Sequence, residues 1–183
     1  TLAVGEESAD ALPGCELVNV ADAQWRTIAQ VGSTLPPVDA HTSPESLALL
    51  LFTAGTSGRP KGAMLTHGNI VSNLLQVSAW VGRGLEEGRE TVIGALPLYH
   101  IFALTANCLV YMAIGGVNVL ITNPRDMEGF IKELKKVPFT FIPGVNTLFN
   151  ALLNTPGFAE LDFSTLKGAL GGGMAVQRAV AER

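Results

Sequence analysis

The second half of the sequence alternates short apolar runs with longer segments that repeat apolar residues at helical spacing. This alternation constrains the fold more than any other feature. The expected strands are 91–97, 118–122, 139–144 and 166–173, and the expected helices are 101–114, 126–136, 145–154 and 175–183. Strands that alternate with helices pair in parallel through right-handed crossovers. We therefore predict an α/β fold of layered, mostly parallel sheets with flanking helices.

Residues 101–122 form a run without a single charged side chain, which taken alone has the length of a membrane-spanning helix. Gly115 and Gly116 interrupt this run, and the segment after them is short and β-branched, as in a buried strand. We expect a buried helix followed by a buried strand, with the membrane span as the alternative.

The first half of the chain has a weaker pattern. Residues 21–31 suggest a short helix, and the apolar run 46–53 is typical of a strand buried on both faces. After a glycine-rich loop, apolar residues at helical spacing predict a helix over 70–81, with Thr66 or Asn69 as its N-cap.

A polar, glycine-bearing segment at 83–89 is the best candidate for a subdomain boundary. On this interpretation, residues 1–82 belong to a first subdomain and residues 90–183 to a second α/β subdomain.

Composition excludes several classes of protein. With 48% hydrophobic and 15% charged residues, the chain can bury a sizeable core. The net charge of −4 and the scattered basic residues indicate no nucleic-acid partner. Cys15 and Cys108 lie far apart in the sequence, so we expect reduced thiols that serve packing in a cytoplasmic protein.

The loop TAGTSGRPKG, residues 53–62, combines three glycines, three hydroxyl side chains and one lysine. It fails as a Walker A loop, because Pro60 replaces the second glycine and Gly62 replaces the hydroxyl residue. It also fails as a nucleophile elbow, because Gly55 and Gly58 are one residue too close. A plain glycine-rich turn is the alternative without a function.

The side chains of this loop favour a polyphosphate ligand. Glycines let backbone N–H groups approach phosphate oxygens, hydroxyl groups add donors, and Lys61 supplies a mobile charge. The loop therefore predicts a nucleotide triphosphate site that is not a Walker A site.

Three segments resemble the motifs of one family, the adenylate-forming enzymes, which include acyl-CoA synthetases, adenylation domains and luciferases. FTAGTSGRPKGAMLTH (52–67) resembles their phosphate-binding signature, LPLYHIFALT (96–105) their second core motif, and GALGGGMAV (168–176) their glycine-rich adenine-side segment. The chain between the motifs is most similar to bacterial long-chain fatty-acid CoA ligases. The resemblance implies an incomplete piece of the large N-terminal domain of such an enzyme.

The family's reaction has two steps: ATP and a fatty acid give an acyl-adenylate and pyrophosphate, and CoA then takes the acyl group as a thioester. The resemblance implies that Lys61 assists departure of pyrophosphate and that Thr53 lies near Mg²⁺. It assigns nucleotide binding to Thr53, Ala54, Gly55, Thr56, Ser57, Gly58, Lys61, Gly62, Ile101, Gly171, Gly172 and Gly173.

The resemblance of the second motif implies that His100 lies beside the acyl carboxylate and the nucleotide. We therefore expect His100, like Lys61, to be a catalytic residue. We expect it to orient and shield the reactants and not to act as a nucleophile; a hydrogen-bonded core histidine is the alternative. Residues 101–104 are expected to flank the acyl tunnel. Some relatives carry a tryptophan gate here, and this sequence has Ala103 and Leu104 instead.

Residues 171–173 are either a turn at a strand end or, as the resemblance implies, a backbone contact to adenine and the acyl chain. The family's Gly-Leu-Thr-Glu motif and later catalytic lysine do not occur in these 183 residues. We therefore expect the isolated chain to be inactive and, with former core surfaces exposed, to self-associate.

Two further alternatives stay open. The loop would also suit a non-catalytic nucleotide- or phosphate-binding module. Peripheral contact with the inner membrane is a second open point, because fatty acids arrive from a bilayer, although no basic amphipathic helix marks it.

Overall fold

The structure is a computed structural model, and it describes residues 41–53 and 60–183 together with 2–3, 17–18, 27, 30–31 and 34–36. The chain divides into two compact units, Thr1–Thr42 and Ser43–Arg183. In the first unit, β1 (Leu2–Ala3) and β2 (Leu17–Val18) pair in parallel. The short helix expected over 21–31 and the thiol of Cys15 lie mostly or wholly outside the described residues.

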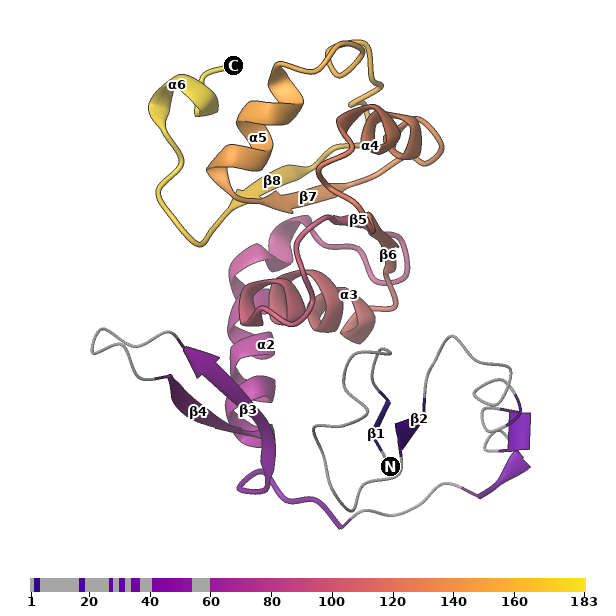
Figure 1. The fold of residues 1–183 in the computed structure, drawn as a ribbon, viewed down its shortest axis with the longest axis vertical. Helices are drawn as coiled ribbons and strands as arrows, with labels where there is room; N and C mark the ends of the chain where they lie inside the picture. Colours follow the sequence, from indigo (N-terminus) through magenta and orange to yellow (C-terminus); the bar gives the residue numbers. More distant parts are fainter. Residues whose placement is uncertain are drawn as a thin grey trace. The chain divides into compact units, whose positions relative to one another are not determined.

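A four-stranded parallel sheet forms the core of the second unit (Figure 1). Its strands are β5 (Thr91–Gly94), β6 (Val117–Leu120), β7 (Phe141–Gly144) and β8 (Gly168–Gly171), in the order β6-β5-β7-β8. Val92 of β5 pairs with Asn118 on one side and with Phe141 on the other. The predicted parallel α/β sheet is confirmed, although each strand is shorter than predicted.

Helices connect these strands where the sequence pattern predicted them, with different bounds. They are α2 (His67–Val81), followed by a short 3-10 helix η2 (Gly82–Gly84), then η3 (Ala103–Leu109), α3 (Val110–Ala113), α4 (Met127–Leu134), α5 (Asn146–Leu153) and α6 (Arg178–Ala181). The segment η3 is a π-helix, which the apolar pattern did not distinguish from an α-helix.

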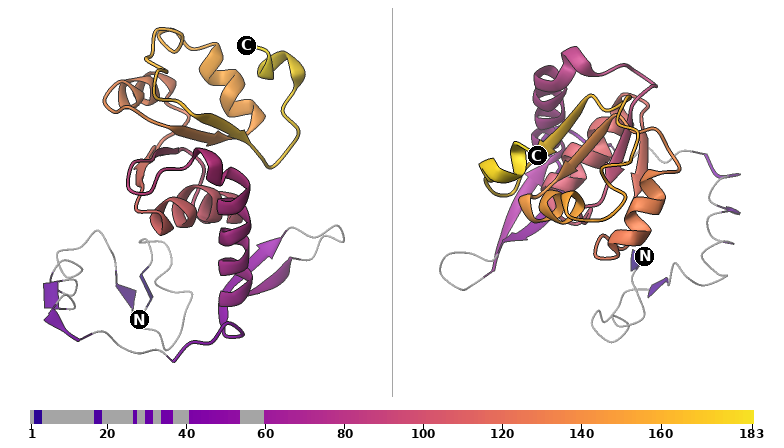
Figure 2. Two further views of the ribbon diagram at one scale, coloured as in Figure 1. Left: turned by 180° about the vertical axis from the view of Figure 1, so that it is seen from behind. Right: turned by 90° about the horizontal axis from the view of Figure 1, so that it is seen from above.

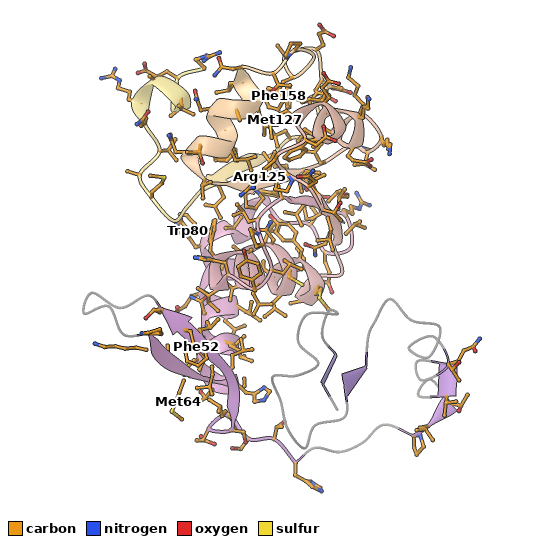
Figure 3. All side chains as sticks on the ribbon, in the orientation of Figure 1. Phe52, Met64, Trp80, Arg125, Met127 and Phe158 are labelled. Carbon is orange, nitrogen blue, oxygen red and sulfur yellow. The ribbon has the colours of Figure 1, made fainter. Side chains whose placement is uncertain are left out.

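Helices cover both faces of the sheet (Figure 2). A hydrophobic core forms on each face, because neighbouring residues of a strand point to opposite faces. Ile93 and Ile142 pack into the core formed with α4 and α5, which Met127 and Phe158 also join (Figure 3). Val92 and Phe141 face the other core. That second core contains Val110 and Tyr111 of α3, with Leu74, Val77 and Val81 of α2 packed against it.

Strand β3 (Leu47–Thr53) forms an antiparallel hairpin with β4 (Lys61–Thr66). The prediction that residues 46–53 are buried on both faces is wrong in this structure. Leu50 is 53% exposed and Phe52 is 75% exposed, because the partner of β3 among the described residues is β4 alone. The pattern also missed β4, whose pairing with β3 is not visible in its own sequence.

Helix α2 begins with a capping box. Thr66 accepts a hydrogen bond from the Asn69 N–H at 3.2 Å, and Asn69 Oδ1 accepts one from the Thr66 N–H at 3.0 Å. Thr66 is therefore the N-cap, as one of the two predictions had it, and the helix begins at His67 instead of residue 70.

A charged cluster joins two strands at the N-terminal edge of the sheet. Glu90 precedes β5 and Lys167 precedes β8; Lys167 Nζ lies 2.7 Å from Glu90 Oε1 and 2.9 Å from Glu86 Oε1. Burial raises the pKa of Glu90, but hydrogen bonds from Lys167 and from the Glu86 N–H outweigh it and hold that pKa below its usual range. The boundary proposed at 83–89 stays a prediction, and this segment supplies Glu86 to the cluster.

The uncharged run 101–122 folds as a helix, a turn and β6, in the predicted order. The prediction that this strand is buried is wrong, because β6 is an edge strand of the sheet, and Val117 and Leu120 are more than half exposed. Within the described part of the chain, no helix has the length and apolar character needed to cross a membrane.

Candidate functional site

A cleft of about 410 Å³ lies at the C-terminal edge of the sheet. Its walls are Leu96, Pro97, Tyr99, His100, Phe102, Val145, Gly173 and Met174. These residues come from the loops that follow β5, β7 and β8. Ligands of open parallel sheets bind at this edge, because the loops after neighbouring strands meet there.

His100 is exposed at this cleft, and its backbone is held by a turn in which its N–H donates to the Pro97 carbonyl oxygen at 3.0 Å. Its ring Nδ1 accepts a hydrogen bond from the Phe102 N–H at 3.2 Å. From this bond we assign the proton of the neutral ring to Nε2. His100 is therefore not the buried core histidine of the alternative interpretation, and its ring has a donor left for a ligand.

Phe102 and Gly172 lie in direct contact across the cleft. A Cβ atom added to Gly172 would lie only 2.5 Å from Phe102 Cζ, so the ring occupies the space that a side chain would need. The Gly172 N–H also donates to the Gly144 carbonyl oxygen at 3.1 Å, which continues the pairing beyond β8. Gly173 has a φ of 75°, a conformation that glycine adopts readily. The third motif is thus packed directly against the second.

A second cavity, of about 220 Å³, lies between the sheet and the helices α2, η3 and α3. It is lined by Val77, Trp80, Val81, Leu85, Ala106, Val110, Tyr111, Phe141, Gly168, Ala169 and Leu170. Gly168 and Leu170 share one face of β8, because every second residue of a strand points the same way, and Gly172 lies directly after the strand. The cavity is almost entirely apolar and follows this face away from the cleft.

The hairpin β3–β4 holds the two ends of the predicted phosphate loop. Thr53 pairs with Lys61, and the Thr53 hydroxyl donates to the Lys61 carbonyl oxygen at 3.5 Å. Gly62 pairs with Phe52, and the Lys61 side chain is exposed. The remaining predicted loop residues, Ala54, Gly55, Thr56, Ser57 and Gly58, lie outside the described residues.

The structure brings some predicted site residues together and leaves others apart. His100 and Gly173 line one cleft, and Gly172 contacts the Phe102 ring of its wall. Thr53, Lys61, Gly62 and Ile101 are not among its lining residues. Gly171 points to the other face of β8, where it contacts Val176.

The predicted magnesium site lies at the β3–β4 hairpin, where Thr53 is the expected ligand. In the regions that the structure describes, no three His, Cys, Asp or Glu side chains cluster as metal ligands would. The Thr53 hydroxyl oxygen is the protein ligand that the sequence predicts for this ion. A hydroxyl oxygen is a type of ligand that magnesium accepts, and magnesium usually takes further ligands from substrate phosphates and water.

Sequence reasoning missed several residues that line these spaces. Tyr99 and Met174 lie beside predicted motif residues, so their positions in the motifs were the available signal. Trp80 and Tyr111 line the apolar cavity, and their sequence positions suggest only helix faces. Their meeting depends on the packing of α2 and α3 against the sheet.

Comparison with known proteins identifies the family. The sequence profile described as AMP-binding enzyme matches residues 4–183. The chain belongs to the AMP-binding enzyme family. The adenylate-forming resemblance is thereby confirmed.

Two curated members of the AMP-binding family illustrate the similarity. The chain is 57% identical over 159 residues to a long-chain-fatty-acid–CoA ligase of Escherichia coli O6:H1, covering 87% of this chain and 28% of that protein. It is 52% identical over 162 residues to a protein of the same name from Haemophilus influenzae, covering 87% of this chain and 29% of that protein. The chain thus spans less than a third of the length of these relatives.

The fold agrees with solved structures of the family. The N-terminal domain of FACL13 from Mycobacterium tuberculosis superposes with a TM-score of 0.70 at 21% identity, over 86% of this chain and 39% of that one. This likeness supports the α/β architecture described above.

Proposed function

We propose that the full-length protein, meaning a polypeptide of its relatives' length that contains these residues, activates long-chain fatty acids. ATP and the acid would give acyl-adenylate and pyrophosphate, and CoA would then take the acyl group as a thioester. The observation that carries this proposal is the cleft shared by His100 and Gly173, with an apolar cavity beyond it on the same face of β8.

The two spaces suit the two ends of a fatty acid. A carboxylate is a weak nucleophile toward phosphorus, so it must be held in line with the α-phosphate. In the cleft, the Nε2–H of His100 is a donor for a carboxylate oxygen, and the Phe102 ring forms part of the wall. The hydrocarbon tail would be buried in the cavity lined by Ala106, Val110 and Leu170.

The hairpin would hold the triphosphate. Residues 54–58 contribute backbone N–H groups and hydroxyls to the β- and γ-phosphates, and Lys61 neutralises charge that develops on the departing pyrophosphate. Thr53 would be one ligand of Mg²⁺, and the ion would supply positive charge that stabilises the phosphates when bound. Gly62, Ile101 and residues 171–173 complete the proposed nucleotide contacts.

The names of the relatives support this assignment. Long-chain-fatty-acid–CoA ligases at 57% and 52% identity cover most of the chain. A non-catalytic phosphate-binding module would need the hairpin loop, but it would have no use for His100 beside an apolar cavity. We place the full-length protein in the cytoplasm, with peripheral attachment to the inner membrane as an open addition to the proposal.

The test is fatty-acid-dependent exchange of labelled pyrophosphate into ATP, measured on the full-length protein. We expect exchange in the wild type, and Lys61→Ala to slow it by roughly 10²-fold or more. Binding of the fatty acid itself should change little. Lys132→Ala, which removes an exposed lysine of α4, is the matched control and should leave exchange unchanged.

An alternative outcome would favour the non-catalytic module. In that case the wild-type protein would bind ATP, and no fatty acid of any length would support exchange.

A further inference from the structure

We propose that Tyr111, backed by Phe141, closes the inner end of the apolar cavity and limits the length of the acyl chain that the site accepts. This inference rests on the proposed function. It adds two residues that determine specificity, neither of which belongs to a recognised motif.

The direction of the cavity follows from β8. Gly172 lies directly after β8 at the end of the strand that is near the cleft, and it contacts the Phe102 ring of the cleft wall. Leu170 and then Gly168 continue from there along one face of β8 toward the N-terminal edge of the sheet, and both line the cavity. A chain that enters beside Phe102 and follows this face therefore reaches Gly168 last.

Tyr111 and Phe141 stand at this inner end. Their ring centroids are 5.8 Å apart with the planes tilted by 54°. Tyr111 is only 4% exposed, whereas Trp80, on the α2 side of the same cavity, is 75% exposed. The cavity thus has one open side and one closed end made of two packed aromatic rings.

The buried carboxylate of Glu90, which lies near Tyr111, also disfavours a longer acyl chain. Burial raises the pKa of the Tyr111 phenol, and the nearby Glu90 carboxylate raises it further, so a negative charge lies close to this ring. Glu90 is 1% exposed and is paired with Lys167. A hydrocarbon that displaced Tyr111 would lie against a buried carboxylate and could not hydrogen-bond to it.

Gly168→Ala should make the cavity smaller, whereas Tyr111→Ala should make it larger. A Cβ atom at Gly168 would lie 3.1 Å from Phe141 Cε1, so alanine would narrow the inner end. Gly168 has no positive φ, and alanine therefore adds volume there without backbone strain.

The experiment compares kcat/KM of the full-length protein for saturated fatty acids of medium, long and very long chain. Tyr111→Ala should raise the preference for the longest acid over the medium one by roughly tenfold, a typical discrimination for hydrophobic pockets. Gly168→Ala should shift the preference toward shorter acids. Tyr111→Phe keeps the ring and should keep the wild-type profile. Met112→Ala, at the neighbouring exposed position of α3, is the control and should also keep it.

The outcomes separate the two proposals. If the wild type activates fatty acids and both Tyr111→Ala and Gly168→Ala change kcat/KM by the same factor at every length, the inference about Tyr111 is wrong. If the wild type activates no fatty acid, the proposed function itself fails. If Tyr111→Ala does not fold, the shift expected for Gly168→Ala still decides the question.

Discussion

Lys167 Nζ lies 2.7 Å from Oε1 of the buried Glu90 carboxylate, and this contact ties the residue before β8 to the residue before β5. Strands β5 and β8 are not neighbours in the sheet, because β7 lies between them. The pair therefore fixes three strands at the edge of the sheet opposite the cleft.

We predict that stability depends on this pair at acidic pH. The folded-state pKa of Glu90 is lowered, so its contribution is fully present above the ordinary glutamate pKa and is lost as the pH falls through the folded value. Glu90→Gln should cost about 2 kcal/mol at neutral pH, the size of a charged hydrogen bond. Thermal unfolding at several pH values would test this. A variant that loses stability on acidification as steeply as the wild type would contradict the prediction.

The contact between Phe102 and Gly172 leads to a prediction about coupling. Gly172→Ala should lower the free energy of unfolding and kcat/KM, because the new Cβ requires the Phe102 ring to move. In a Phe102→Ala background the same change should cost much less, giving a coupling of about 1 kcal/mol or more. Urea unfolding of the wild type, the two single variants and the double variant measures this coupling free energy. Simple additivity of the two substitutions would mean that the contact is not energetically important.

His100 should act through position and hydrogen bonding. His100→Ala should lower kcat/KM for adenylation by less than about 10²-fold, the lower end of general acid–base effects. His100→Gln should retain more activity, because its amide offers an N–H donor in place of Nε2–H. Steady-state kinetics with the fatty acid varied at saturating ATP would show this order. A loss near 10⁴-fold in both variants would indicate a direct chemical role instead.

The capping box of α2 should contribute measurably to stability. Thr66→Ala removes the acceptor for the Asn69 N–H and should cost about 1 kcal/mol. Thr66→Ser keeps the hydroxyl and should be close to wild type. Urea unfolding followed by helix signal is the measurement, and equal losses in both variants would point to the methyl group instead.

The isolated 183-residue chain should self-associate. Leu50, Phe52 and Met64 are exposed on one face of the hairpin, where Phe52 and Met64 are 75% and 68% exposed (Figure 3). Such patches are typically covered in folded proteins. Light scattering should give a mass above that of a monomer, and Phe52→Ser with Met64→Ser should reduce it. A monomer in the wild-type chain would refute this expectation.

The sequence predicted the parallel sheet because each strand of it is a distinct apolar run between helical segments. It did not predict the strand 61–66, because KGAMLT has one long apolar pair and its strand character comes from pairing with β3. It also overestimated burial of β3, since an apolar run does not reveal which partners cover it.

The candidate site was predictable in its motifs and not in its contacts. His100 and the glycines were recognised from the chain, but the Phe102–Gly172 contact depends on packing of η3 against β8. The apolar cavity was even less predictable from the sequence, because Trp80, Tyr111 and Gly168 come from three elements far apart in the chain. No local pattern links them.

The order of the strands has a consequence for synthesis on the ribosome. The hairpin ends, Thr53 and Lys61, are 8 residues apart, whereas Thr91 and its hydrogen-bond partner Thr140 are 49 apart. The hairpin can therefore close early, while β5 must wait for β7 to emerge. During this interval Val92 and Ile93, both fully buried in the finished fold, have no cover on one side. The nascent chain then exposes apolar surface that favours aggregation.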